Sequence, residues 1–171
     1  MPVTTLDRLV PFQPAALLLY ASLFLYIMLP SWLLHSKRDL VICSAVISGL
    51  CLAGLVVFFL WPSSLAPYPV DRAQHPLFAY LVSLDKPRNV CPSLHAAFAI
   101  FTAIFIHRLA LRLGDPLLVR VVSWSWCVAI LYSTLATRQH VAVDLYAGTL
   151  LGALWASAYL QFFPPAEETL A

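Results

Sequence analysis

The sequence predicts an all-α integral membrane bundle of about five transmembrane helices. Of its 171 residues, 61% are hydrophobic and 11% are charged, whereas soluble domains average roughly 45–50% and 25%. Four stretches contain no charged residue, and a spanning helix needs about 20 mostly apolar residues. These stretches are residues 9–34, 40–70, 121–137 and 145–166.

A fifth span is expected between the second and third of these stretches. Residues 96–106 carry no charge and are apolar apart from Thr102, and 93–113 reaches spanning length if His107, Arg108 and Arg112 extend their polar groups to the membrane interface. The expected spans are therefore 13–34, 40–61, 93–113, 117–136 and 141–163.

The first span is interpreted as a retained helix and not as a secretory signal. Asp7 and Arg8 make a weak charged region before it, and no small-residue cleavage site follows it. Without Gly/Ser linkers or internal repeats, residues 1–171 are expected to form a single domain. Its one extended loop, 62–92, holds six of the thirteen prolines, and residues 76–84 within it are expected to form a short interfacial helix.

Positively charged residues divide evenly between the two ends of the expected bundle. One end has Lys37, Arg38, Arg108, Arg112 and Arg120, and the other has Arg8, Arg72, Lys86, Arg88 and Arg138. If Arg72, Lys86, Arg88 and Arg138 bind an anion, they do not count toward orientation. Five basic residues then remain at the first end and one at the second, which places the first end in the cytoplasm. We therefore expect a bacterial inner (cytoplasmic) membrane protein whose 62–92 loop and active site face the periplasm.

Two polar clusters stand at the N-termini of the expected third and fifth helices. Because one span separates these helices, both begin on the same membrane face. Ser93 follows Pro92 and can cap the third helix, and His95 lies in its first turn. His140 and Asp144 are four residues apart at the start of the fifth helix, on one side of it.

Such an arrangement favours a bound phosphate. Helix N-termini present unpaired N–H groups and partial positive charge, to which Arg138 adds. An acid within an apolar helix, as Asp144 is, is costly and is a functional candidate. Behind it, Gly148, Gly152 and Ala156 continue a four-residue stripe that suits close helix packing.

These residues resemble two motifs of the type 2 phosphatidic acid phosphatase superfamily, a Pro-Ser-Gly-His turn and a Ser-Arg-x5-His-x3-Asp segment. Residues 92–95 are similar to the turn, with Leu94 in place of glycine, as in a branch that resembles inositol-phosphorylceramide synthases. Residues 133–144 match the spacing of the second motif, but Thr134 replaces its arginine and Arg138 stands closer to the histidine.

A third motif of the superfamily, Lys-x6-Arg-Pro, matches least. Arg72 could supply its arginine, but Ala73 replaces the proline and Leu65 stands where the lysine is expected. Lys86 or Arg88 are candidates to replace that lysine.

The resemblance covers a motif-bearing core of about residues 55–160 and implies a lipid phosphatase that needs no metal and no cofactor. It implies that His140 attacks phosphorus and forms a phosphohistidine, that Asp144 orients the ring, and that His95 protonates the leaving oxygen and then activates water. The implied phosphate-binding residues are Arg138, Ser93, Arg72, Lys86 and Arg88. A site at helix ends suits a lipid phosphate held at the bilayer surface, such as phosphatidic acid, phosphatidylglycerol phosphate or a prenyl pyrophosphate, and no nucleic acid partner is expected.

Three alternatives stay open from the sequence. The phosphoryl group could pass to a lipid or sugar hydroxyl, which would make the protein a phosphotransferase. His95, His140 and Asp144 could instead bind a metal ion, although nearby basic residues would repel a cation. A non-enzymatic membrane carrier or assembly protein could use the buried acid.

Overall fold

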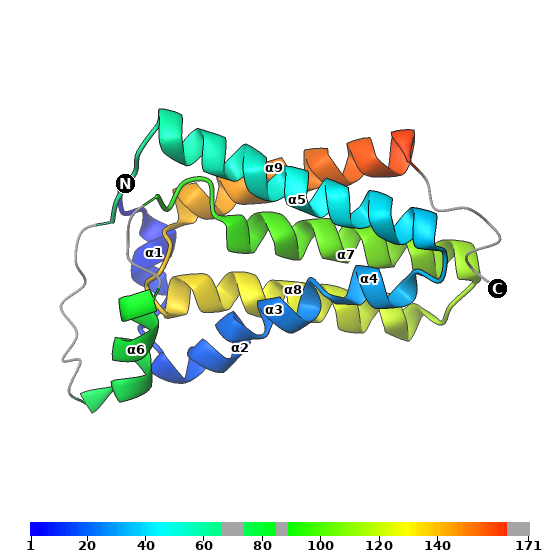
Figure 1. The fold of residues 1–171 in the computed structure, drawn as a ribbon. Helices are drawn as coiled ribbons and strands as arrows, with labels where there is room; N and C mark the ends of the chain where they lie inside the picture. The colour runs from blue at the N-terminus through cyan, green and yellow to red at the C-terminus, as the bar shows by residue number, and fades with distance from the viewer. Residues whose placement is uncertain (66–73, 85–88, 164–171) are drawn as a thin grey trace.

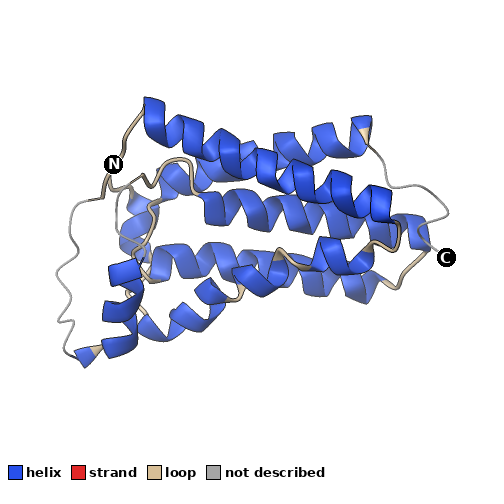
Figure 2. Ribbon diagram, viewed as in Figure 1, coloured by secondary structure: helices blue, strands red, loops and turns tan. Residues whose placement is uncertain are grey.

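The computed structural model describes residues 1–65, 74–84 and 89–163 (Figure 1). Figure 2 shows that these residues form helices and no strand, so the predicted all-α fold is confirmed. In chain order the elements are α1 (Thr5–Leu9), the 3-10 turn η1 (Pro14–Ala16), α2 (Leu17–Ala21), α3 (Leu23–Tyr26), α4 (Leu29–Leu33), α5 (Lys37–Leu60), α6 (Pro76–Leu84), α7 (Leu94–Leu113), α8 (Leu117–Ala136) and α9 (Ala142–Phe162).

Helix α7 is the centre of the bundle. In Figure 1 it lies between α5 and α9 on one side and α8 with the α2–α4 segment on the other. A much larger share of its residues is buried than in α5 or α8. Its side chains Phe101 and Phe105 pack against Tyr159 of α9, and α7 supplies more of the buried apolar core than any other helix.

The outer surface of the bundle is apolar. Large side chains such as Phe59 and Leu118 are exposed on it, and lipid rather than water covers an apolar surface of this extent. Among the described residues, the segments long and apolar enough to cross a membrane are Pro14–Leu33, α5, α7 and α8. The protein is therefore an integral membrane protein. Four of the five predicted spans thus have the length and hydropathy of a membrane span, and α9, 21 residues long, stays a predicted span.

The first predicted span, 13–34, is wrong as a single helix, because it is divided into η1, α2, α3 and α4. Pro30 explains the break before α4. It has no N–H to donate to the carbonyl of Tyr26, and its ring crowds that carbonyl. The chain tightens there, and the N–H of Met28 donates to the carbonyl of Leu25 in a three-residue turn (3.2 Å).

The remaining helices begin and end close to the predicted residues. Helix α6 has the predicted bounds. Helix α7 is capped as expected, since the Ser93 hydroxyl accepts a hydrogen bond from the Ala96 N–H (3.3 Å). Helix α5 begins three residues earlier than predicted, because the Ser36 hydroxyl caps it by accepting from the Asp39 N–H (3.5 Å).

Helices α7 and α9 approach each other through the predicted stripe of small residues. A Cβ added at Gly148 would overlap the carbonyl oxygen of Ser93, and one at Gly152 would overlap that of Ala97. The backbones are so close that the Ser93 N–H donates a hydrogen bond to the carbonyl of Asp144 (3.0 Å). Only residues without larger side chains permit this contact.

Gly152→Ala is expected to destabilise the protein by about 1–3 kcal/mol, as overpacking of a tight contact generally does. The added methyl group would have to displace the backbone of Ala97. Thermal unfolding in detergent measures the effect, with Ala158→Val as the matched control because it enlarges an exposed position of the same helix. An unchanged midpoint for Gly152→Ala would contradict the close packing of α7 and α9.

Candidate active site

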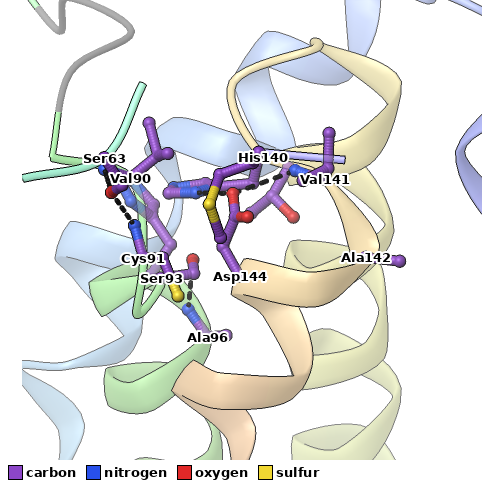
Figure 3. A network of polar contacts seen from close by, with 12 residues as sticks. Ser63, Val90, Cys91, Ser93, Ala96, His140, Val141, Ala142 and Asp144 are labelled. Carbon is purple, nitrogen blue, oxygen red and sulfur yellow. Dashed lines mark hydrogen bonds and ion pairs between the residues drawn. The ribbon is translucent and has the colours of Figure 1, made fainter. Parts of the chain in front are cut away.

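The N-termini of α7 and α9 lie side by side at one end of the bundle, as the topology predicted (Figure 1). Figure 3 shows Ser93, at the start of α7, close to His140 and Asp144 at the start of α9. The backbone bond between Ser93 and Asp144 joins the two helix starts directly. The two polar clusters of the sequence therefore form one site.

His140 and Asp144 form a hydrogen-bonded pair. Nδ1 of His140 is 3.2 Å from Oδ2 of Asp144, and the same oxygen accepts from the Val141 N–H (3.0 Å). Asp144 is fully buried, whereas His140 precedes the helix and borders a pocket. Because Nδ1 contacts the carboxylate, Nε2 is the ring nitrogen left for reaction.

His95 stands beside this pair. Its ring centroid is 5.8 Å from that of His140. The Tyr20 ring stacks on it at 4.0 Å, and the Tyr20 hydroxyl is 3.3 Å from Nδ1 of His95. Nε2 of His95 is buried and has no hydrogen-bond partner in the described part of the chain. Burying such a nitrogen is unfavourable, which favours a ligand or reacting group at this point.

The loop before α7 is held by Ser63. Its hydroxyl accepts hydrogen bonds from the N–H groups of Val90 and Cys91, both at 3.0 Å (Figure 3).

Burial and, to a smaller extent, the charge of Asp144 raise the pKa of the Cys91 thiol. A thiol with a raised pKa stays protonated at neutral pH, so Cys91 is a poor nucleophile.

Arg138, predicted to bind phosphate, also holds the N-terminal segment. Its backbone is in the left-handed region, with φ at 58°. Its terminal nitrogens donate to the carbonyls of Asp7 (2.6 Å) and Val10 (2.7 Å), at the end of α1. It also borders, with His140, a pocket of about 200 Å³. Arg138 therefore lies at the site, with two of its N–H groups bonded to α1.

Asp7 is a site residue that the sequence analysis missed. Its buried carboxylate accepts from the N–H of Ala142, the first residue of α9 (2.7 Å), and from the N–H and hydroxyl of Thr4 (2.7 and 2.8 Å). The Thr4-x-x-Asp7 spacing matches a capping box and could have indicated a helix here. No signal in the sequence marks Tyr20.

The other predicted phosphate-binding residues are less defined. Ser93 is fully buried at the start of α7, where its hydroxyl serves as the helix cap. Arg72, Lys86 and Arg88 lie outside the described residues. Thr134, which stands at the position of the motif arginine, is buried and donates to the carbonyl of Leu131 (2.8 Å).

The described residues contain no group of three or more His, Cys, Asp or Glu side chains placed to hold a metal ion. They do place a histidine–carboxylate pair, a second histidine and two helix N-termini together. Such an arrangement can support nucleophilic and acid–base chemistry, and helix N-termini favour a bound anion. The protein is thus of the class of membrane-embedded helical bundles with a histidine-based site at one end.

A protein-family comparison identifies that class. The model of the PAP2 superfamily, the type 2 phosphatidic acid phosphatases, matches residues 61–168. This is more than half of the 171-residue chain, and the chain belongs to the PAP2 superfamily. Members of this superfamily are generally phosphatases and phosphotransferases. No curated protein and no solved structure matches the chain.

Proposed function

We propose that the protein is a lipid phosphate phosphatase that hydrolyses a phosphomonoester or pyrophosphate of a membrane lipid. Phosphatidic acid, phosphatidylglycerol phosphate and prenyl pyrophosphates are the substrate candidates. The observation that carries the proposal is the His140–Asp144 pair with the His95 ring 5.8 Å from that of His140. Membership of the PAP2 superfamily supports the reaction class.

In the first step His140 acts as the nucleophile. With Nδ1 held by Asp144, Nε2 attacks phosphorus and forms the P–N bond as the P–O bond to the lipid breaks. Asp144 stabilises the positive charge that develops on the ring. His95 donates a proton to the leaving lipid oxygen.

In the second step water completes the hydrolysis. His95, now neutral, takes a proton from water as the water oxygen attacks phosphorus, and the P–N bond breaks to restore His140. Tyr20 suits both steps, because its hydroxyl oxygen can accept from the Nδ1–H of His95, which keeps this proton while Nε2 first donates a proton and then takes one from water. The hydrogen bond between Tyr20 and His95 can therefore persist throughout the cycle.

The position of the site fits a lipid substrate. The helix starts that carry the histidines lie at one end of the bundle, where a head group at the bilayer surface could enter while the chains stay in lipid. The N–H groups of α7 and Arg138 would bind the phosphate oxygens, together with Ser93 and the predicted cations Arg72, Lys86 and Arg88.

His140→Ala is expected to reduce turnover to background, because the P–N bond cannot form without the ring. The measurement is phosphate release from a panel of lipid phosphates by purified protein in detergent, with a chelator present. His35→Ala is the matched control, since His35 is an exposed histidine outside the site. An active His140→Ala protein would disprove the nucleophile assignment.

The same assay separates the alternatives. Loss of wild-type activity in the chelator would favour a metal site, and a phosphorylated product from an added alcohol would identify a phosphotransferase. A folded wild-type protein that is inert toward every lipid phosphate would favour a carrier or assembly role.

Tyr20→Phe is expected to lower kcat about 3- to 10-fold, because a neutral hydrogen bond is worth roughly 0.5–1.5 kcal/mol. KM should change little, since Tyr20 acts through His95 and not on the substrate. Tyr132→Phe, at an exposed tyrosine of α8, is the control. If Tyr20→Phe kept the wild-type kcat, Tyr20 would not position His95.

We further propose that the site faces the periplasm from a bacterial inner membrane. Lys37 and Arg38 begin α5, and Arg108 and Arg112 lie near the end of α7, at the bundle end opposite the site. Positive charge of this kind favours the cytoplasmic side.

Because α9 ends at that same opposite end, a fusion at the C-terminus should lie in the cytoplasm. Green fluorescent protein fused there should fluoresce, and alkaline phosphatase fused at the same residue should be inactive. The reverse pair of results would place the active site in the cytoplasm.

A further inference from the structure

A pocket of about 200 Å³ lies between the N-terminal segment and the start of α9. His140 and Arg138 border it from one side, and Val3, Asp7 and Arg8 border it from the N-terminal segment. The proposed nucleophile and α1 therefore face the same space. This segment precedes the residues that match the PAP2 superfamily, so no family motif describes it.

The position of α1 is fixed by bonds to the catalytic end of the bundle. Arg138 donates to the carbonyls of Asp7 and Val10, and the N–H of Gln13 donates to the carbonyl of Ala136 (2.9 Å). The Asp7 carboxylate accepts from the first N–H of α9. A residue on α1 is thus held in place beside the pocket before any ligand binds, which lowers the entropic cost of binding.

The charges around the pocket favour an anion. Arg8 and Arg138 both border it, while the carboxylate of Asp7 is engaged by three hydrogen bonds from Ala142 and Thr4. Arg8 is exposed on α1, so its guanidinium can reach a phosphate without losing a buried contact.

The site lacks one arginine of the superfamily motif, and Arg8 would replace its positive charge. The arginine of the Ser-Arg-x5-His-x3-Asp motif is replaced by Thr134, whose buried hydroxyl bonds to the carbonyl of Leu131. Arg138 uses two of its N–H groups to hold α1. A second cation at the pocket would add to the charge of Arg138 and replace the one that Thr134 lacks.

We propose that α1 forms one wall of the substrate's phosphate pocket and that Arg8 is a phosphate-binding residue. This inference rests on the proposed phosphatase function. The pocket is smaller than the roughly 300–1,000 Å³ of sites for drug-sized ligands, so it suits a terminal phosphate group and not a large polar head group.

The test compares Arg8→Ala, Arg8→Lys and Arg38→Ala in the full chain, with lipid phosphate as substrate and inorganic phosphate as competitive inhibitor. For Arg8→Ala, KM and the inhibition constant of inorganic phosphate should both rise about 10-fold, since a charged hydrogen bond is lost. Its kcat should stay within about 3-fold, because an interaction common to ground and transition states is removed.

The companion variants separate charge from structure. Arg8→Lys should recover part of the affinity, because lysine keeps the charge but not the planar donor fork. Arg38→Ala removes an exposed arginine at the opposite end and should match the wild type. Thermal unfolding midpoints of all three should equal that of the wild type.

Two failures are distinguishable. An active wild-type protein whose Arg8→Ala variant has unchanged KM and phosphate inhibition would overturn this inference alone. A wild-type protein without activity toward any lipid phosphate would overturn the proposed function, and the role of Arg8 with it.

Discussion

The close contact between α7 and α9 is the constraint on which the site depends. Gly148 and Gly152 allow the backbone of α7 to approach, and the Ser93 N–H then bonds to the carbonyl of Asp144. His95 is two residues beyond one partner of this bond, and His140 is four residues before the other. The packing of the α7 and α9 backbones therefore limits the separation of the two rings.

Polar groups within this apolar bundle are concentrated where the contact places them. An unpaired polar group costs free energy in such surroundings, and both carboxylates have nearby donors, although Oδ1 of Asp144 has no hydrogen-bond partner among the described residues. Asp144 accepts from His140 and Val141, and Asp7 accepts from Ala142 and Thr4. Two acids thereby bond to the N-terminal region of α9, and the N-terminal segment becomes part of the same network as the His140–Asp144 pair.

Sequence reasoning found the parts of the fold that depend on local pattern. Apolar runs predicted the spans, and Ser93 predicted the cap of α7. The four-residue spacing of His140 and Asp144 predicted their contact. The Asp7–Ala142 and Tyr20–His95 contacts join residues 135 and 75 positions apart. No periodicity encodes such distant pairs, because they arise only when the helices pack. The break before α4 follows from Pro30, which a count of apolar residues does not weigh.

The position of α1 also bears on the even division of basic residues between the two ends. Arg138 is at the site end, and Arg8 borders the same pocket. A cation that pairs with a bound anion contributes little to the charge difference that orients a membrane protein, whereas Lys37 and Arg38 are exposed and pair with no proposed ligand. If Arg8 joins Arg138 in binding phosphate, the basic residues at the site end serve catalysis, and those at the other end alone determine orientation. Anion binding at one end and membrane orientation at the other then explain why both ends carry the same number of basic residues. They also agree with the proposed periplasmic position of the site.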